Sequence, residues 1–186
     1  MARKWIRRPM AVCTAGGTAA HHCFELASGV GLVFQPDLGL GRAATLWGAQ
    51  ILVWAGLAAR GPRRADPVLA VLAGASLAGV AVHFWLWPWE PGRAGIPALT
   101  EAEGLSAWQM PTYNAVLRAW ALAAVGSLAF ELESGSRRFA IAGGALLPLF
   151  VVSARHHFNW LKEQASSNPT WWNRGIALAR ATELCD

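Results

Sequence analysis

His21, His22 and Glu25 are the residues of this 186-residue chain whose types and spacing point most directly to chemistry. They lie together in residues 18–29, TAAHHCFELASG, where the other side chains are small or apolar. On a helix, side chains three and four positions apart are neighbours, so both imidazoles would lie beside the carboxyl group. Such groups can exchange protons with a bound molecule, and we predict a catalytic role for all three residues.

The composition indicates that this stretch belongs to a membrane protein. The chain is 54% hydrophobic and only 15% charged, whereas soluble domains are about 25% charged. Five apolar segments each approach the roughly 20 residues that a helix needs to cross hydrocarbon. We predict an all-α, polytopic integral membrane protein, a bundle of five transmembrane helices at residues 9–34, 43–59, 67–87, 112–130 and 139–160. A signal peptide is the alternative for the first segment, although its apolar run continues past any cleavage site.

The basic residues predict the orientation of this bundle. With five spans, one side of the membrane receives the N-terminus and the loops near residues 60–66 and 131–138. These hold Arg3, Lys4, Arg7, Arg8, Arg60, Arg63, Arg64, Arg137 and Arg138, and the opposite loops hold only Arg42 and Arg93. The positive-inside rule then places the N-terminus inside and the C-terminus outside. Glu131 and Glu133 are expected to be solvated charges of an inner loop.

The segments outside the spans are predicted to lie on the outer face. The outer loop, 88–111, is expected to be irregular or partly helical, because it is rich in proline. Trp85, Trp87, Trp89 and Trp108 would lie at the outer interface, where tryptophan is favoured. The outer tail, 161–186, is expected to contain a short amphipathic helix from about Trp171 to Leu184, which could lie on the membrane surface.

Polar residues of other predicted spans reach the same depth as the first cluster. At about 1.5 Å per residue, His22, Glu25, His83 and His156 lie about 20–26 Å from the inner ends of their spans. Ionisable side chains inside a membrane are rare and face the bundle interior. We therefore predict an outer-leaflet pocket around His21, His22 and Glu25. The residues predicted to bind a substrate there are His83, Arg118, His156, His157, Gln50 and Trp85.

The His-x-x-x-Glu spacing of His21 and Glu25 resembles the helix motif of the emopamil-binding sterol isomerases, which also have five spans. The resemblance covers this motif alone, which lies on a different span in that family. Leu26 follows Glu25 here, where the family has glycine. The resemblance implies acid–base chemistry on a lipophilic molecule.

Three functions remain open from the sequence. The leading hypothesis is a membrane-embedded enzyme that uses proton transfer to isomerise or cyclise a lipid- or isoprenoid-like molecule. The alternative is a metal- or haem-binding redox protein, because imidazole and carboxylate are ligands of transition metals. Its ligands would come from His21, His22, Glu25, His83 and His156. The third is a small transporter or a non-catalytic accessory subunit, in which pairs such as Glu25 with Arg118 would specify helix packing.

The expected partners follow from the same pattern. They are the lipid bilayer, a lipophilic small molecule, and either further copies of the chain or a larger membrane complex. The net charge of +5 does not indicate nucleic acid, because the basic residues fall in short clusters between apolar runs. The expected location is a bacterial plasma membrane. The sequence alone identifies no cofactor.

Overall fold

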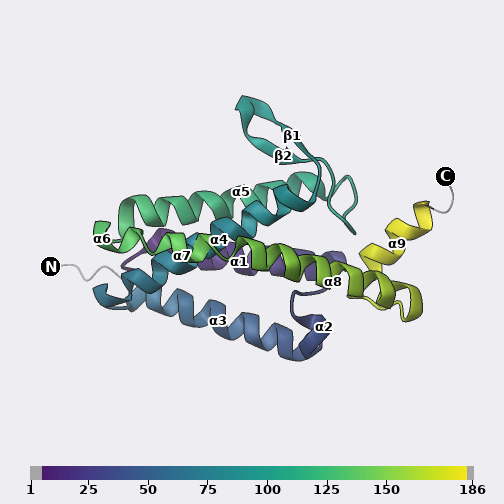
Figure 1. The fold of residues 1–186 in the computed structure, drawn as a ribbon, viewed down its shortest axis with the longest axis horizontal. Coiled ribbons are helices and arrows are strands. Elements are labelled where there is room, and N and C mark those ends of the chain that lie inside the picture. The colour runs from purple at the N-terminus through teal and green to yellow at the C-terminus, as the bar shows by residue number, and fades with distance from the viewer. Residues whose placement is uncertain (1–5, 184–186) are drawn as a thin grey trace.

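The computed structural model describes residues 6–183, which are mostly helical (Figure 1). Five long helices run side by side: α1 (Pro9–Ser28), α3 (Leu40–Arg60), α4 (Asp66–Leu86), α5 (Met110–Gly126) and α8 (Leu147–Ser167). The shorter helices are α2 (Gln35–Leu38), α6 (Ser134–Arg137), α7 (Ala140–Gly144) and α9 (Arg174–Glu183). We call the end of the bundle where α1 begins the N end, and the end that carries α9 the C end. Arg3, Lys4 and Leu184 lie outside the described residues.

Three helical segments of the described chain are long and apolar enough to cross a membrane. They are Arg63–Leu86, Met110–Glu131 and Ser134–Ser167, which cover the third predicted span up to Leu86 and contain the fourth and fifth. The first two of these segments include the short helices η1 (Arg63–Ala65) and η3 (Ser127–Glu131) beside α4 and α5. Helices α1 and α3 have 20 and 21 residues but are not among the three.

Helix α1 carries its polar residues on its buried face. The buried positions are Ala11, Thr14, Ala15, Thr18, His21, His22, Glu25 and Ser28, which recur every three or four residues. This spacing forms one stripe along a helix, so α1 turns its polar side to its neighbours α3 and α5. The helix ends at Ser28, earlier than the predicted span, because Gly29 adopts the left-handed conformation with φ of 81°.

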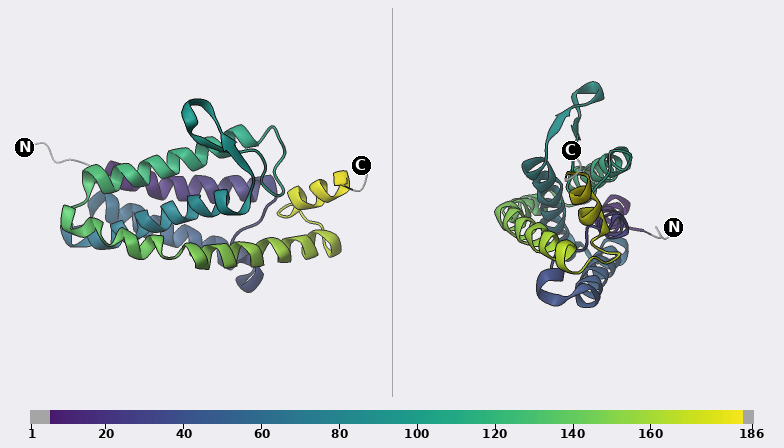
Figure 2. Two further views of the ribbon diagram at one scale, coloured as in Figure 1. Left: turned by 45° about the horizontal axis from the view of Figure 1, so that its top comes forward. Right: turned by 90° about the vertical axis from the view of Figure 1, so that its right-hand side faces the viewer.

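A short β-hairpin lies in the connection between α4 and α5. Strand β1 (Trp89–Pro91) pairs antiparallel with β2 (Pro97–Leu99), and the hairpin projects sideways from the bundle (Figures 1 and 2). The turn between them contains the 3-10 helix η2 (Arg93–Gly95). The side chain of Asn114 on α5 fixes the hairpin, since its amide exchanges two hydrogen bonds with the backbone of Leu99 at 2.8 and 2.9 Å. This loop is therefore more regular than the sequence predicted.

Helix α9 packs against the C-terminal end of α1. The backbone N–H of Gly175 donates to the carbonyl oxygen of Gly29 at 3.1 Å. A Cβ on Gly175 would collide with the carbonyl oxygen of Gly104. Ile176, in the next position, is only 1% exposed. The predicted C-terminal helix is present, and its first turn covers the end of the bundle.

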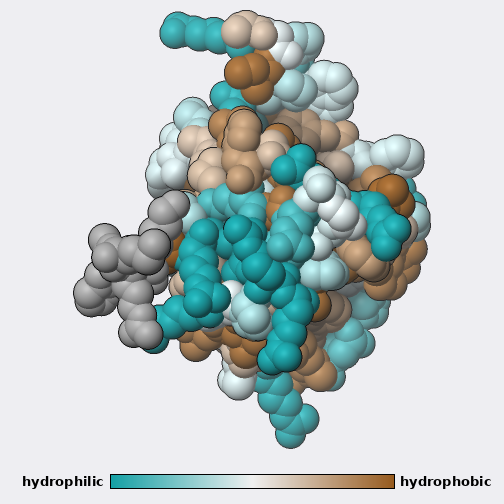
Figure 3. Space-filling model, turned by 90° about the vertical axis from the view of Figure 1, so that its left-hand side faces the viewer, coloured by the Kyte–Doolittle hydropathy of each residue, from teal (hydrophilic) through white to brown (hydrophobic). Residues whose placement is uncertain are grey.

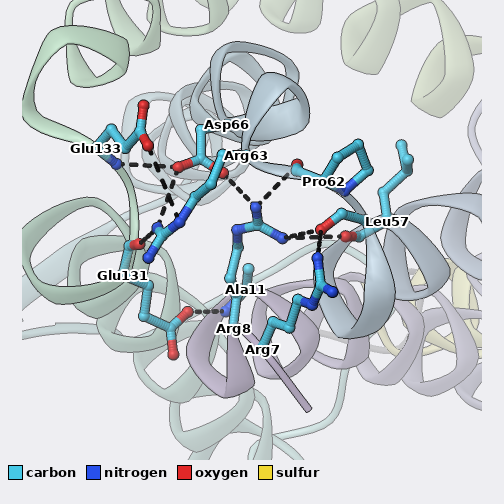
Figure 4. Close-up of polar contacts among 10 residues, drawn as sticks. Arg7, Arg8, Ala11, Leu57, Pro62, Arg63, Asp66, Glu131 and Glu133 are labelled. Atoms are coloured by element: carbon cyan, nitrogen blue, oxygen red, sulfur yellow. Dashed lines mark hydrogen bonds and ion pairs between the residues drawn. The ribbon is translucent and has the colours of Figure 1, made fainter. Parts of the chain in front are cut away.

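Arg8 and Asp66 form a buried ion pair at the N end (Figure 4). Their side chains are 2% and 0% exposed, and Nη2 of Arg8 lies 2.5 Å from Oδ1 of Asp66. The guanidinium group also donates to the carbonyl oxygens of Gly61 and Pro62, each at 3.0 Å. Asp66 Oδ2 accepts the backbone N–H of Glu133 at 3.1 Å. One pair therefore joins the start of α1, the α3–α4 connection and the turn before α6.

Glu131 caps the beginning of α1 from the end of η3. Its two carboxylate oxygens accept the backbone N–H groups of Met10 and Ala11 at 2.6 and 2.9 Å. These N–H groups have no partner within their own helix, and a carboxylate also suits the positive end of the helix dipole. The prediction that Glu131 is a solvated loop charge is therefore wrong. Hydrophilic side chains gather at the centre of the N end, with hydrophobic ones beside them (Figure 3).

Helices α4 and α7 approach so closely that a methyl group does not fit between them. A Cβ on Gly143 would collide with the carbonyl oxygen of Val71, whereas a Cβ on Gly144 would meet no atom of the described chain within 4 Å. We expect Gly143→Ala to lower the free energy of unfolding by about 1–3 kcal/mol, because overpacking forces the helices apart. Gly144→Ala is the matched control. Thermal unfolding in detergent measures both, and equal midpoints would contradict the close approach.

Candidate functional site

A cavity of about 210 Å³ lies among five helices near the C end. Its polar lining includes His21, His22 and Glu25 from α1, His83 from α4 and His157 from α8. The remaining wall is mainly apolar and aromatic, with contributions from Val33, Phe34, Trp47, Trp54, Leu72, Trp120, Phe150 and Phe158. The histidine and glutamate side chains therefore form the ionisable part of a cavity that is otherwise mainly apolar.

Tyr113 joins Glu25 to His83. The phenol oxygen of Tyr113 donates to Oε1 of Glu25 at 2.8 Å, and Nδ1 of His83 lies 3.2 Å from the same oxygen. A phenol has one proton to donate, so His83 is the donor to Tyr113 when that proton is directed at Glu25. The three residues come from α5, α1 and α4, and Tyr113 is 1% exposed. This chain of hydrogen bonds holds the carboxyl group in one position.

The second oxygen of Glu25 faces both predicted histidines. Oε2 lies 3.3 Å from Nε2 of His21 and 4.0 Å from Nδ1 of His22. The ring of His21 stacks on Trp120 with centroids 5.2 Å apart, and the ring of His22 lies 4.0 Å from that of Trp47. Both imidazoles are therefore held beside the carboxyl group, as the helical spacing predicted.

Two glycine positions show how α1 reaches α5 at this site. A Cβ on Gly17 would lie 2.7 Å from the side chain of Trp120, whereas one on Gly16 would meet no described atom within 4 Å. Gly17 therefore faces α5 and allows Trp120 to stack on His21. The small side of α1 and the ring on α5 fit together only with glycine at position 17.

The structure brings some of the predicted binding residues to the cavity and leaves others outside it. His83, His157 and Gln50 line it. His157 is buried, and its Nε2 lies 3.0 Å from the carbonyl oxygen of Val30. His156 instead has a side chain 60% exposed and lies 3.8 Å from Asp37. Adjacent residues on a helix point about 100° apart, so α8 can direct only one of the two histidines inward.

Arg118 and Trp85 lie apart from the cluster. The guanidinium group of Arg118 donates to the carbonyl oxygen of Pro97 at 3.1 Å, under the hairpin. Trp85 is 68% exposed on α4. Glu25 has Tyr113 as its hydrogen-bond partner, so the pair of Glu25 with Arg118 that the sequence suggested is not formed.

Tyr113 and the cavity tryptophans were missed by the sequence analysis. Tyr113 is the single tyrosine of the chain and lies near the outer end of the fourth predicted span. Its position one residue inside that span, at the depth of the histidines, is the signal that could have found it. A phenol and an indole carry no charge at neutral pH, so the pattern of charged residues marks neither Tyr113 nor Trp47, Trp54 and Trp120 on the cavity wall.

Three imidazole nitrogens at the site lack a hydrogen-bond partner among the described residues. They are Nδ1 of His21, of His22 and of His157, all buried. A buried polar atom without a partner costs about 1–3 kcal/mol, so native structures seldom keep several together without a reason. These atoms are available to a bound molecule or ion. The ligand atoms of His21, His22 and Glu25 lie within 4.8 Å of one another, close enough to surround one ion.

The fold and site define a helical protein with three candidate membrane-spanning helices and a buried cluster of imidazole, carboxyl and phenol groups. Comparisons with protein-family models, with curated proteins and with solved structures find no match to this chain.

Proposed function

We propose that the protein is a membrane-embedded enzyme that transfers protons to and from a lipophilic substrate, in an isomerisation or cyclisation. The observation that carries this proposal is the placement of Glu25. Its carboxyl group is fixed by Tyr113 at 2.8 Å, lies beside two imidazoles and lines a mainly apolar cavity. A proton donor and a proton acceptor in water-poor surroundings are what such chemistry needs.

The outward faces of the helices support five spans with the N-terminus inside. Helix α3 exposes Leu46, Leu52 and Val53 by 45%, 74% and 63%, although it is not among the most apolar helices. Helix α1 buries the polar stripe that lowers its hydropathy. Both helices would thus present apolar surface to lipid, which is the arrangement of a membrane bundle with a polar interior. The basic loops at the N end support its cytoplasmic placement.

The proposed reaction has two steps, in which the cluster first donates a proton and then accepts one. Glu25, in its acid form, gives a proton to a carbon–carbon double bond of the substrate. Its carboxylate, or the imidazole of His21 or His22, then takes a proton from a neighbouring carbon, so that the double bond has moved. No oxidant or reductant is needed. The positive charge between the two steps would lie among the rings of the cavity tryptophans, whose faces attract cations.

A second candidate function rests on the geometry of His21, His22 and Glu25. Ligands about 2.1 Å from one ion in tetrahedral geometry are separated by about 3.4 Å. The 3.3 Å between His21 and Glu25 fits this value, whereas the 4.0 Å between His22 and Glu25, and the limit of 4.8 Å for the whole set, require His22 to move toward the ion. These three residues, with His83 nearby, would hold zinc, iron or copper, which could polarise a bound substrate or carry an electron.

Analysis of the purified protein for metals and lipids separates the two candidates. For the proton-transfer enzyme we expect a co-purifying lipid, less than stoichiometric metal and no haem absorption band. About one metal ion per chain, lost in His22→Ala and retained in His156→Ala, would instead support the metal site. His156 is the matched control, because it is a histidine of the same chain whose exposed side chain lies outside the cavity.

A further inference from the structure

Helices α3 and α8 stand on either side of the cavity and make little direct contact. Helix α3 packs on α1, and α8 packs on α4 (Figure 2). The cavity lining includes Gln50 on α3 and Leu149, Ser153 and Ala154 on α8. Gln50 is exposed, and Leu149 is 60% exposed, so this lining reaches the molecular surface. The mouth of the cavity is therefore on the flank of the bundle.

The C end of the cavity is covered by the segment between α1 and α3. The ring of Phe34 stacks on that of Trp47 with centroids 5.7 Å apart, and Nε1 of Trp47 donates to the carbonyl oxygen of Val33 at 3.1 Å. Helix α2 continues this cover and contacts both α3 and α8. A molecule that approached along the bundle axis from this end would meet these side chains, whereas the flank is open.

Exposed apolar side chains lie around the mouth, with Gln50 as a polar one among them. Val53 on α3 is 63% exposed, and Leu149 on α8, which also lines the cavity, is 60% exposed. If the helices cross a bilayer as proposed, this mouth opens into lipid and not into water. The inference below therefore rests on the proposed function.

The size of the cavity limits how much of a lipid it can enclose. An apolar cavity of about 150 Å³ in a well-studied lysozyme variant binds one benzene molecule. The 210 Å³ here hold a group somewhat larger than one six-membered ring. A lipid with a long chain cannot be enclosed completely, so most of it must remain in the mouth or in the bilayer.

We propose that the substrate is a chain-like lipid whose ring-sized terminal group enters sideways from the bilayer between α3 and α8. This terminal group lies beside Glu25, His83 and Trp120, while the chain stays between the two helices. The reaction is then confined to the end of the molecule. The substrate atoms that react are those that lie next to the polar cluster, and the apolar mouth selects for a long apolar chain.

Two photoactivatable probes test this placement in the full-length protein reconstituted in lipid nanodiscs. Each is a long alkyl chain ending in a cyclohexene ring, with a diazirine either on the ring or at mid-chain. We expect the ring-labelled probe to mark α4 or α5 near His83 and Trp120, and the chain-labelled probe to mark α3 or α8 near Gln50 and Ser153. Labelling of the end loops by both probes, or of the cavity interior by both, would overturn the proposal.

A variant at the mouth provides a second readout. We expect Ala154→Trp to reduce ring labelling of α4 and α5 to background, and Val152→Trp, on the same helix but outside the cavity lining, to leave it unchanged. Equal labelling in both variants would contradict lateral entry. Ala154→Leu serves in place of Ala154→Trp if thermal unfolding shows that the larger residue disrupts the fold.

The outcomes also separate this inference from the function on which it rests. Labelling as expected, with no proton exchange into any co-purifying lipid, would support lateral entry of a lipid and refute the proton-transfer function. Proton exchange into a co-purifying lipid, with probe labelling confined to the end loops, would support the proton-transfer function and refute lateral entry.

Discussion

Replacing Glu25 with glutamine is expected to slow proton transfer to the substrate by about 10²- to 10⁴-fold, the usual contribution of a positioned acid–base group. Glutamine keeps the shape of the side chain and can still accept the hydrogen bond of Tyr113, but it cannot donate and regain a proton. The measurement is the incorporation of deuterium from heavy water into the co-purifying lipid, followed by mass spectrometry.

Glu163→Gln is the matched control for this prediction, because it makes the same chemical change at an exposed position of α8. We expect it to leave deuterium incorporation unchanged. Thermal unfolding of the Glu25→Gln protein establishes that its fold is intact. If deuterium entered the lipid at the same rate with glutamine at position 25, the acid–base role of Glu25 would be refuted.

The long helices could be predicted from the sequence because hydrophobic length is a local property. The third predicted span, 67–87, agrees closely with α4, Asp66–Leu86. The sequence also contains a signal for the end of α1, because Gly29 follows the last turn and glycine readily adopts the left-handed conformation found there. The hairpin at 89–99 could not be predicted, because its strands have three residues each and depend on a side-chain contact with Asn114 of the following helix, 15 residues beyond Leu99.

The sequence predicted the level at which each site residue lies along its helix, but not the direction in which its side chain points. Spacing within α1 placed His21 and His22 beside Glu25, and the rise per residue brought His83 to the same level. The rotation of a helix about its axis is set by packing against its neighbours. It decided that His157 faces the cavity while His156 faces outward, and that Arg118 lies under the hairpin. Those choices depend on long-range contacts that one sequence does not display.

The N end shows the same limit for charged residues. Glu131 lies among loop charges in the sequence, yet it caps a helix that begins more than a hundred residues earlier. Asp66 was not singled out either, although an aspartate followed by proline is a common beginning of a helix. Its burial with Arg8 depends on how α1, α3 and α4 meet.

The Asp66→Ala substitution is expected to lower the free energy of unfolding by about 3–5 kcal/mol, because it leaves the buried charge of Arg8 without its partner. Arg63→Ala is the matched control, since Arg63 lies 3.5 Å from the same carboxylate with a side chain 66% exposed. Its loss should cost less than about 1 kcal/mol, as for other exposed pairs. Unfolding by a denaturing detergent in mixed micelles measures both, and equal losses would show that burial does not set the strength of this pair.

The double substitution of Arg8 and Asp66 by alanine isolates the pair itself. Each single change leaves one buried charge uncompensated, whereas the double change leaves none, so its cost should be less than the sum of the two single costs. It should nevertheless remain less stable than the natural protein, because the guanidinium group also donates to the carbonyl oxygens of Gly61 and Pro62. Additive losses would mean that Arg8 acts through these carbonyl groups alone, and that Asp66 contributes mainly through the backbone N–H of Glu133.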